Sequence, residues 1–469
     1  MIRRPLVLAL ASVLSVSTLL PGTAAAEDLL QTYELARTSD PQLSAAESSR
    51  LAVKEGAVQT RAAMLPQLDG SASFTRSRNY SRGELFTNAD GTLSGGNTGS
   101  DTSTRGTQVR LNQMIYDHAN ITRHQSQKAL SQASDFQLEA AGDSLITRTS
   151  AAYFNVLIAL ESLSAAEAAE TALKKQFDYA SKRLEVGLAP ITDVHEARAR
   201  ANTILARNAV EDSYQALAEL TGQPIHNIRG LPKDFQPSLP ESRDSEGWVQ
   251  TAIENNPSLR AKDLQVQSAE ANVQTARAGH YPTLYLNGSY GDNTTWGDSS
   301  LLSGRVNRDV DGRDYGPSVG VTLAVPIFSG GATQSRVRQA LANRDVASDE
   351  LEQQKRALVR NTRNAYQTLV ASVSEVEARR LALVSAQSAY DASQVGLEVG
   401  TRTVLDVLQN QNNLFVAQLE YARARYNHLQ NRLLLEQAAG TLDVNTVQDV
   451  NRLLTADAEA QVQAGDLQR

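Results

Sequence analysis

The spacing of apolar residues changes twice along the first half of the chain, and the same changes recur in the second half. Residues 43–65 and 259–281 carry apolar side chains at helical spacing, and each segment ends at a proline. Apolar and polar residues then alternate, which is typical of strands with one apolar face. Two long tracts, residues 118–186 and 331–399, return to helical spacing. The pattern therefore predicts helix, paired strands and long helix, in that order, twice.

Short strings support a duplicated unit. Asp40-Pro41-Gln42-Leu43 returns as Asn256-Pro257-Ser258-Leu259, and Leu184-Glu185-Val186-Gly187 returns as Leu397-Glu398-Val399-Gly400. A proline-rich stretch between the two copies blocks continuous helix. We therefore divide the chain into a signal peptide at residues 1–26, a first repeat at 27–222, a connector at 223–251, a second repeat at 252–440 and a polar tail at 441–469 that is loosely held at its end.

Each repeat supplies two expected strands that suit a membrane-spanning barrel. Transmembrane strands need about ten residues with one apolar face. We expect long polar loops between the paired strands, at residues 79–103 and 291–314. Aromatic residues gather in these segments, as interfacial girdles require. The four strands are expected near residues 68–80, 104–116, 282–291 and 315–328. The alternative is a soluble hairpin that covers a core.

The two long helical tracts are too long for a globular domain. At about 1.5 Å per residue each reaches roughly 100 Å. Their apolar seams are thin, with spacings of three, four and seven residues that suit coiled-coil packing. Neither helix can bury itself alone, so partners must come from the other repeat and from other chains.

The amino terminus predicts secretion. Arg3 and Arg4 precede an apolar run that ends in Pro21-Gly22, and small residues up to Ala26 follow. This is the pattern of a cleaved signal peptide. A membrane anchor is the alternative, but the run is short for a spanning helix. No later segment is apolar enough to cross as a helix, so the expected route across a membrane is a barrel.

Composition excludes several kinds of chemistry. The chain has no cysteine, which rules out disulfides, thiolate catalysis and a lipid-modified cysteine. Its net charge of −7 makes nucleic acid an unexpected partner. The six histidines lack metal-ligand spacing, and no glycine-rich phosphate loop occurs. We therefore expect no enzyme, no cofactor and no metal site.

The whole mature chain resembles the TolC family of outer-membrane efflux proteins. The resemblance rests on the duplicated order of elements and on specific strings. It is closer to the TolC branch than to the lipoprotein branches, because the anchoring cysteine is missing. The strings are Val186-Gly187-Leu188-Ala189-Pro190-Ile191-Thr192-Asp193-Val194, Val399-Gly400-Thr401-Arg402-Thr403-Val404-Leu405-Asp406-Val407-Leu408 and Tyr421-Ala422-Arg423-Ala424-Arg425-Tyr426.

The resemblance implies a mixed α+β membrane protein that forms a trimeric duct. Each protomer would give four strands to a shared transmembrane β-barrel and its helices to a long periplasmic α-helical barrel, built from two structural repeats. Implied partners are a periplasmic adaptor protein, an inner-membrane pump of the RND or ABC type and outer-membrane lipid. The implied function is export of drugs, small toxic compounds or polypeptides through a gated tunnel in the cell outer membrane.

The resemblance also points to a constriction. It places Asp406 at an acidic ring that faces the tunnel axis, where three carboxylates would favour cations. The alternative role for Asp406 is helix capping, because Thr403 and Asp406 have the spacing of a capping box. The family's second acidic position corresponds to Gln409, which is neutral. A charge-assisted lock is implied between Arg402 and Asp193, and a lock tyrosine of the family corresponds to Leu397.

The two turns are the implied docking sites for the adaptor. They contain Gly187, Leu188 and Ala189 in the first repeat, and Gly400 and Thr401 in the second. Ordinary C-capping also explains the glycines. Two other functions stay open: a passive outer-membrane porin, which leaves the long helices unexplained, and a trimeric coiled-coil stalk or adhesin, which leaves the strands unexplained.

Overall fold

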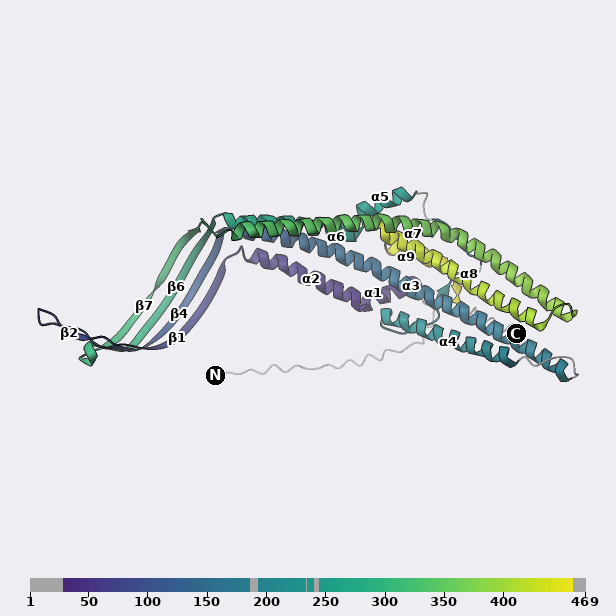
Figure 1. Ribbon diagram of the computed structural model, residues 1–469, viewed down its shortest axis with the longest axis horizontal. Coiled ribbons are helices and arrows are strands. Elements are labelled where there is room, and N and C mark those ends of the chain that lie inside the picture. Colours follow the sequence, from purple (N-terminus) through teal and green to yellow (C-terminus); the bar gives the residue numbers. More distant parts are fainter. Residues whose placement is uncertain (1–27, 186–192, 233, 240–243, 459–469) are drawn as a thin grey trace, which may run out of the picture.

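The molecule is long and narrow, with a β-sheet at one end and a bundle of helices along the rest of its length (Figure 1). The computed structural model describes residues 28–185, 193–232, 234–239 and 244–458. The expected signal peptide lies outside these residues. The carboxyl-terminal ends of both long helices lie at the end opposite the sheet (Figure 1).

The two repeats contain corresponding helices, and the same capping chemistry starts one pair of them. Asp40 accepts a hydrogen bond from Leu43 N at 2.9 Å, and Asn256 accepts one from Leu259 N at 3.1 Å. A proline follows each cap in the first turn, where its missing N–H costs nothing. The first repeat holds α1 (Leu29–Ser39), α2 (Pro41–Ala62), α3 (His118–Glu185) and α4 (Asp193–Thr221). The second holds α5 (Ser245–Asn255), α6 (Pro257–Arg277), η1 (Ala278–His280), α7 (Ala332–Glu398) and α8 (Val404–Ala439).

The long helices α3 and α7 have 68 and 67 residues, and only narrow stripes of them are buried. On α7 the buried stripe includes Leu358, Thr362, Leu369, Ser372 and Val376, at coiled-coil spacing. Small hydroxyl side chains in that stripe let neighbouring helices approach closely. Among the described residues, none of the helices has the length and apolar character needed to cross a membrane.

One antiparallel sheet joins the repeats. Its strands are β1 (Gln67–Ser81), β4 (Thr98–Tyr116), β6 (Thr283–Leu301) and β7 (Val306–Ala324), in the order β1-β4-β6-β7. A small hairpin of β2 (Leu85–Thr87) and β3 (Leu93–Gly95) and the turn η2 (Leu302–Gly304) lie at its outer end. Because β4 pairs with β6, the sheet is continuous from one repeat into the other.

The expectation of long polar loops was wrong for most of their length. Strands β4, β6 and β7 continue through residues that we assigned to loops, and β7 ends at Ala324, just before Pro326. Polar pairs between strands stabilise these outer parts. Thr104 and Thr295 lie 3.1 Å apart through their hydroxyl oxygens. Since backbone hydrogen bonds to a neighbouring strand continue into these outer parts, serine- and asparagine-rich sequence can remain extended.

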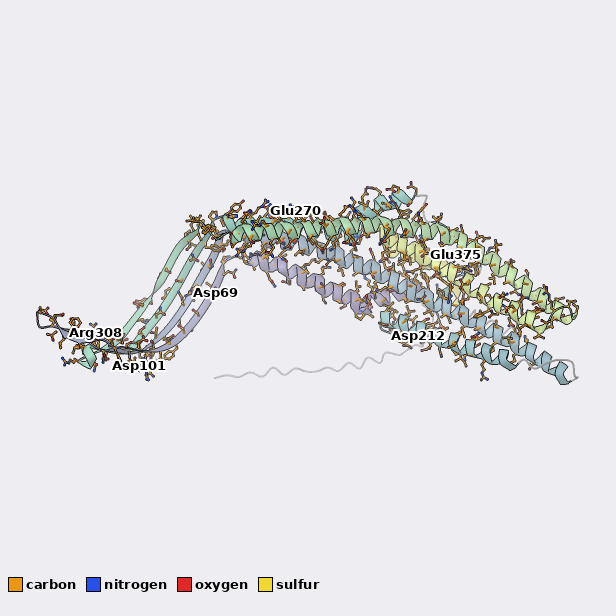
Figure 2. The ribbon with its side chains drawn as sticks, in the orientation of Figure 1. Asp69, Asp101, Asp212, Glu270, Arg308 and Glu375 are labelled. Atoms are coloured by element: carbon orange, nitrogen blue, oxygen red, sulfur yellow. The ribbon has the colours of Figure 1, made fainter. Side chains whose placement is uncertain are left out.

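The sheet has an apolar face and a polar face near the helices. Leu68 pairs with Leu111, Leu111 with Gly288 and Gly288 with Val319. Leu68 and Val319 are exposed, and Leu111 is half-buried. The neighbouring row, which points the other way, contains Asp69, Arg110, Ser289 and Ser318. We call the exposed apolar face between Val325 and Tyr315 the apolar band. Farther out the same face is charged: Arg76 and Arg78 both bind Asp101, which lies near the outer end of the sheet (Figure 2).

The segment after Gly440 is packed, contrary to its expected character as a polar tail. It forms α9 (Val444–Leu453) and β8 (Ala456–Asp457), and β8 pairs with β5 (Arg229–Gly230) of the connector. Asp443 caps α9, and Val447 and Val450 are fully buried. The polar composition concealed an amphipathic helix. The end of the tail, residues 459–469, lies outside the described residues.

A central core forms where this segment meets the helices. It brings together Leu29 and Tyr33 of α1, Tyr153 and Leu157 of α3, and residues of α8 and α9. Asn451 of α9 accepts a hydrogen bond from Leu29 N at 3.0 Å and donates one to Asp28, the cap of α1.

The second repeat also begins earlier than expected, because α5 starts at Ser245 inside the stretch assigned to the connector.

Candidate functional site

The turn after α7 is a compact Schellman motif. Gly400 has a φ of +80°, which residues with a side chain rarely adopt. Thr401 N donates to Gly396 O at 2.8 Å, and Gly400 N donates to Leu397 O at 3.2 Å. These bonds satisfy carbonyls that the end of a helix leaves free. The turn therefore has one well-defined shape, from which the next helix starts.

Arg402 folds back over the end of α7. Its backbone N donates to Gly396 O at 3.0 Å, and a Cβ added at Gly396 would meet Arg402 Cγ at 2.6 Å. Glycine at 396 therefore makes room for the arginine stem. Leu397 is buried, with 8% of its surface exposed.

Asp406 completes the capping box at the start of α8. Its Oδ2 atom accepts hydrogen bonds from Thr403 N and Thr403 Oγ1, both at 2.9 Å, and Asp406 N donates to Thr403 Oγ1 at 3.2 Å. The pKa of Asp406 lies below its ordinary value. The largest cause is the backbone hydrogen bond from Thr403, followed by the hydroxyl bond from Thr403 and the positive charge of Arg402. The capping role is thus confirmed, and the carboxylate is held ionised in a fixed orientation.

Gln409 follows one turn later on α8 and is exposed. Its side chain donates to Asn413 Oδ1 at 3.1 Å. The start of α8 therefore presents a carboxylate and then an amide. Leu397, Arg402, Asp406 and Gln409 all lie at the tip of the helical bundle, where α7 turns into α8.

The first-repeat turn is only partly described. Gly187, Leu188 and Ala189 lie outside the described residues. Asp193 is the first residue of α4, and its side chain also lies outside the description. The end of α3 and the start of α4 are at the same tip as Gly400 and Thr401 (Figure 1). The structure thus brings the two turn regions to one end, and the expected contact between Arg402 and Asp193 stays a prediction.

Sequence reasoning missed an ion pair between the repeats in which the arginine is buried and the glutamate is half-buried. Arg425 of α8, 5% exposed, donates to both oxygens of Glu161 on α3 at 2.6 and 2.7 Å, and to Pro232 O at 3.2 Å. Tyr426 donates to Glu161 at 3.1 Å and accepts from Leu231 N at 3.3 Å. Burial, followed by the charge of Glu161, raises the pKa of Tyr426. The string at residues 421–426 was visible in the sequence, but its partner on α3 was not.

A second missed residue is Asp143 on α3. Burial, and then the charge of Glu139 one turn earlier, raise the pKa of Asp143 to about 7. Burial raises the pKa of Tyr33 on α1. The charge of Arg37 opposes this rise, and the charge of Asp143 adds to it. This carboxyl group therefore changes its charge near neutral pH. Neither the residue type of Asp143 nor its spacing from other residues marked it as a candidate site in the sequence.

Comparison with known proteins matches the chain to one family over both repeats. The sequence profile described as outer membrane efflux protein matches residues 32–223 and 248–441. Outer membrane protein TolC of Escherichia coli (strain K12) is 34% identical over 437 residues, covering 92% of this chain and 85% of that protein. Outer membrane protein TolC of Vibrio cholerae is 32% identical over 432 residues, covering 91% of this chain and 93% of that protein.

More distant relatives and solved structures agree with this match. The alkaline protease secretion protein AprF of Pseudomonas aeruginosa is 28% identical and covers 91% of this chain and 87% of its own length. The fold is similar to a crystal structure of a membrane protein from Pseudomonas aeruginosa, with a TM-score of 0.70 at 21% identity, over 88% of this chain and 92% of that one. It is also similar to CusC, with a TM-score of 0.68 at 18% identity, over 89% and 92%.

Proposed function

The chain belongs to the outer membrane efflux protein family, and on that premise we propose that three copies form a duct whose gate is the helix tip. Members of this family are transport channels. The chain is an outer-membrane exit duct of the kind that serves efflux and type I secretion, with its helical part in the periplasm. The number of copies, the gate and the cargo are our proposals.

The sheet is the observation that supports assembly. Within the described residues, β1 and β7 each have a strand neighbour on one side only. Four strands cannot close a barrel around a lumen, and long unpaired edges associate readily with other strands. Pairing β7 of one copy with β1 of the next in a closed ring of three removes every edge. The polar face would then line the lumen, and the apolar band would face lipid.

The apolar band has the length that a membrane requires. It extends from Tyr315 on β7 to Val325, directly after that strand, and a strand tilted by about 45° crosses the hydrocarbon core in about 9–11 residues. Aromatic residues lie near its outer limit, where Phe74 and Trp296 approach to 6.1 Å between ring centroids. The charged rows beyond the band would lie in the headgroup layer of outer-membrane lipid.

The gate is proposed at the start of α8. A ring of three Asp406 carboxylates would attract cations, and Gln409 would add a neutral ring one turn farther along. Arg402 is exposed and would bind Asp193 in the closed state. The ordered shape of the Gly400 turn supports this role, because a lock needs a fixed geometry on at least one side.

The same turns are the proposed docking sites for a periplasmic adaptor. The proposed docking residues are Gly187, Leu188 and Ala189 of the first repeat and Gly400 and Thr401 of the second. The adaptor would connect the duct to an inner-membrane pump of the RND or ABC type. The cargo is proposed to be drugs, small toxic compounds or polypeptides. One relative is named for alkaline protease secretion and another for cobalt-zinc-cadmium resistance, and these names support polypeptides and small toxic compounds as cargo.

Single-channel recording in lipid bilayers tests this function. A gated duct gives small cation-favouring currents that rise in Arg402→Ala and in Asp193→Ala, whereas Arg423→Ala, an exposed arginine far along α8, leaves them unchanged. A stalk gives no current, and a porin gives large open currents in the wild type. If both lock variants conduct like the wild type, the proposed lock between Arg402 and Asp193 is wrong.

A further inference from the structure

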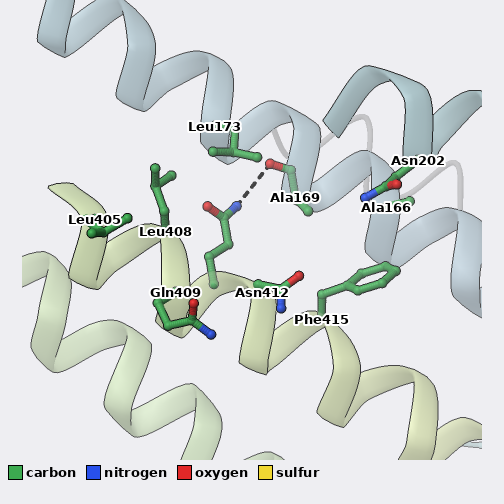
Figure 3. Close-up of a pocket in the computed structure, with 10 residues that line it drawn as sticks. Ala166, Ala169, Leu173, Asn202, Leu405, Leu408, Gln409, Asn412 and Phe415 are labelled. Atoms are coloured by element: carbon green, nitrogen blue, oxygen red, sulfur yellow. Dashed lines mark hydrogen bonds between the residues drawn. The ribbon is translucent and has the colours of Figure 1, made fainter. Parts of the chain in front are cut away.

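A cavity of about 170 Å³ lies between α3, α4 and α8, beside the first turns of α8 (Figure 3). Leu408 and Phe415 of α8 point into it from one side (Figure 3). Four amide side chains form the polar part of the lining: Asn202 of α4 and Gln409, Gln411 and Asn412 of α8. The walls thus come from both repeats, at the seam that separates the two helix pairs.

The cavity exists because α3 supplies small residues opposite large ones. Ala166 and Ala169 line it where longer side chains would fill the seam. Gln411, only 7% exposed, donates its amide N–H to Ala169 O at 3.0 Å (Figure 3). This hydrogen bond links α8 to the backbone of α3 beside the cavity. The seam is therefore held together without being filled.

The lining selects for a neutral ligand. No lining residue in the described part of the chain is ionisable, so a charged group would lose its hydration without gaining a partner of opposite charge. Amide side chains both donate and accept hydrogen bonds. A comparable engineered apolar cavity of about 150 Å³ takes one benzene molecule. One ring with one uncharged polar substituent therefore fits both the volume and the chemistry.

We propose that this cavity binds a neutral single-ring compound that carries an amide or similar group, and that the bound compound holds α8 against α3. The proposal rests on the gate described above, because Asp406 and Gln409 lie on the same turns of α8. A ligand that touches α3 and α8 together keeps all its contacts only while the two helices stay adjacent. Its preference for that arrangement shifts the equilibrium toward the closed duct.

Binding is tested with benzamide and the full-length protein in detergent, by saturation-transfer NMR. The expected dissociation constant is in the millimolar range, which is usual for a compound of this size. Ala169→Leu fills the cavity and should weaken binding about tenfold or more, equivalent to about 1.4 kcal/mol. Ala172→Leu is the matched control, because Ala172 is also half-buried on α3 but does not line the cavity. Benzoate and benzylamine, which are charged, should bind more weakly than benzamide.

Gate coupling is tested by adding benzamide to single channels. The open fraction should fall in the wild type and in Ala172→Leu, and stay constant in Ala169→Leu. If Ala169→Leu does not assemble, Phe415→Leu removes the aromatic wall and should weaken binding instead. Absence of binding, binding unaffected by both cavity variants, or binding without a fall in the open fraction overturns the proposal. A wild type that conducts no current contradicts the duct itself, and the NMR measurement still reports on the cavity.

Discussion

The side-chain stem of Arg402 lies directly on Gly396, where an added Cβ would come within 2.6 Å of Arg402 Cγ. Gly396→Ala should therefore displace the arginine while improving the local helix propensity by up to about 1 kcal/mol. We expect higher single-channel conductance with an unchanged or slightly raised melting temperature. Gly142→Ala, at a helical glycine with open space around it, is the control and should leave the conductance unchanged.

Asp406 has two roles that separate variants can distinguish. Asp406→Asn keeps a capping side chain but removes the charge, so cation selectivity should fall and the reversal potential in a salt gradient should approach zero. Thr403→Ala keeps the charge and should cost about 1 kcal/mol of stability through the lost cap. If Thr403→Ala lowers selectivity as much as Asp406→Asn does, the geometry of the cap and not the carboxylate charge sets the selectivity.

The ion pair of Arg425 and Glu161 should be one of the larger local contributions to stability. Arg425→Leu leaves Glu161 and a backbone carbonyl without their donor, and about 3 kcal/mol should be lost. Arg423→Leu, two positions away, removes an exposed arginine that pairs with half-buried Glu420, and should cost at most about 1 kcal/mol. Thermal unfolding followed by circular dichroism compares the two. Equal losses would show that burial of the pair adds nothing.

Asp143 should make the protein less stable as the pH rises through the acidic range. The unfolded chain releases this proton near pH 3.8, whereas the folded protein keeps it until about pH 7. The contribution of neutral Asp143 to the free energy of unfolding is complete below pH 3.8. It declines as the pH rises to about 7 and is absent at higher pH. Asp143→Asn should remove this decline and add ~1–2 kcal/mol at pH 8, after allowance for partial solvent exposure.

The check is the melting temperature measured from pH 4 to pH 8. Asp212→Asn, on the exposed face of α4, serves as the control and should reproduce the wild-type profile. An Asp143→Asn profile that also matches the wild type would mean that Asp143 stays ionised across this range.

The helices were largely predictable from the sequence, because their ends carry local signals. The tracts expected at residues 118–186 and 331–399 correspond to α3 at His118–Glu185 and α7 at Ala332–Glu398. Glycine stops the second of them by a turn that needs a positive φ. The fold class, the family and the outer-membrane location implied by the strings are confirmed by the comparisons.

The rest depended on contacts that no local pattern contains. The outer parts of β4, β6 and β7 read as loops, because serine, asparagine and aspartate do not favour strands unless a neighbouring strand pairs with them. Arg425 was part of a visible string, but Glu161 is brought to it by packing of α3 against α8. The cavity arises from alanines on one helix and large side chains on another, so neither segment predicts it alone.

The contacts of Asn451 have a consequence for the order of folding. This residue near the carboxyl end binds Asp28 and Leu29, which begin the first helix, and its neighbours Val447 and Val450 fill the central core. The core therefore cannot pack completely until the segment that contains Val447, Val450 and Asn451 is present. Joining such distant segments is slow because the intervening chain must first be brought together. The last part of the chain to be made thus completes the structure that the first part began.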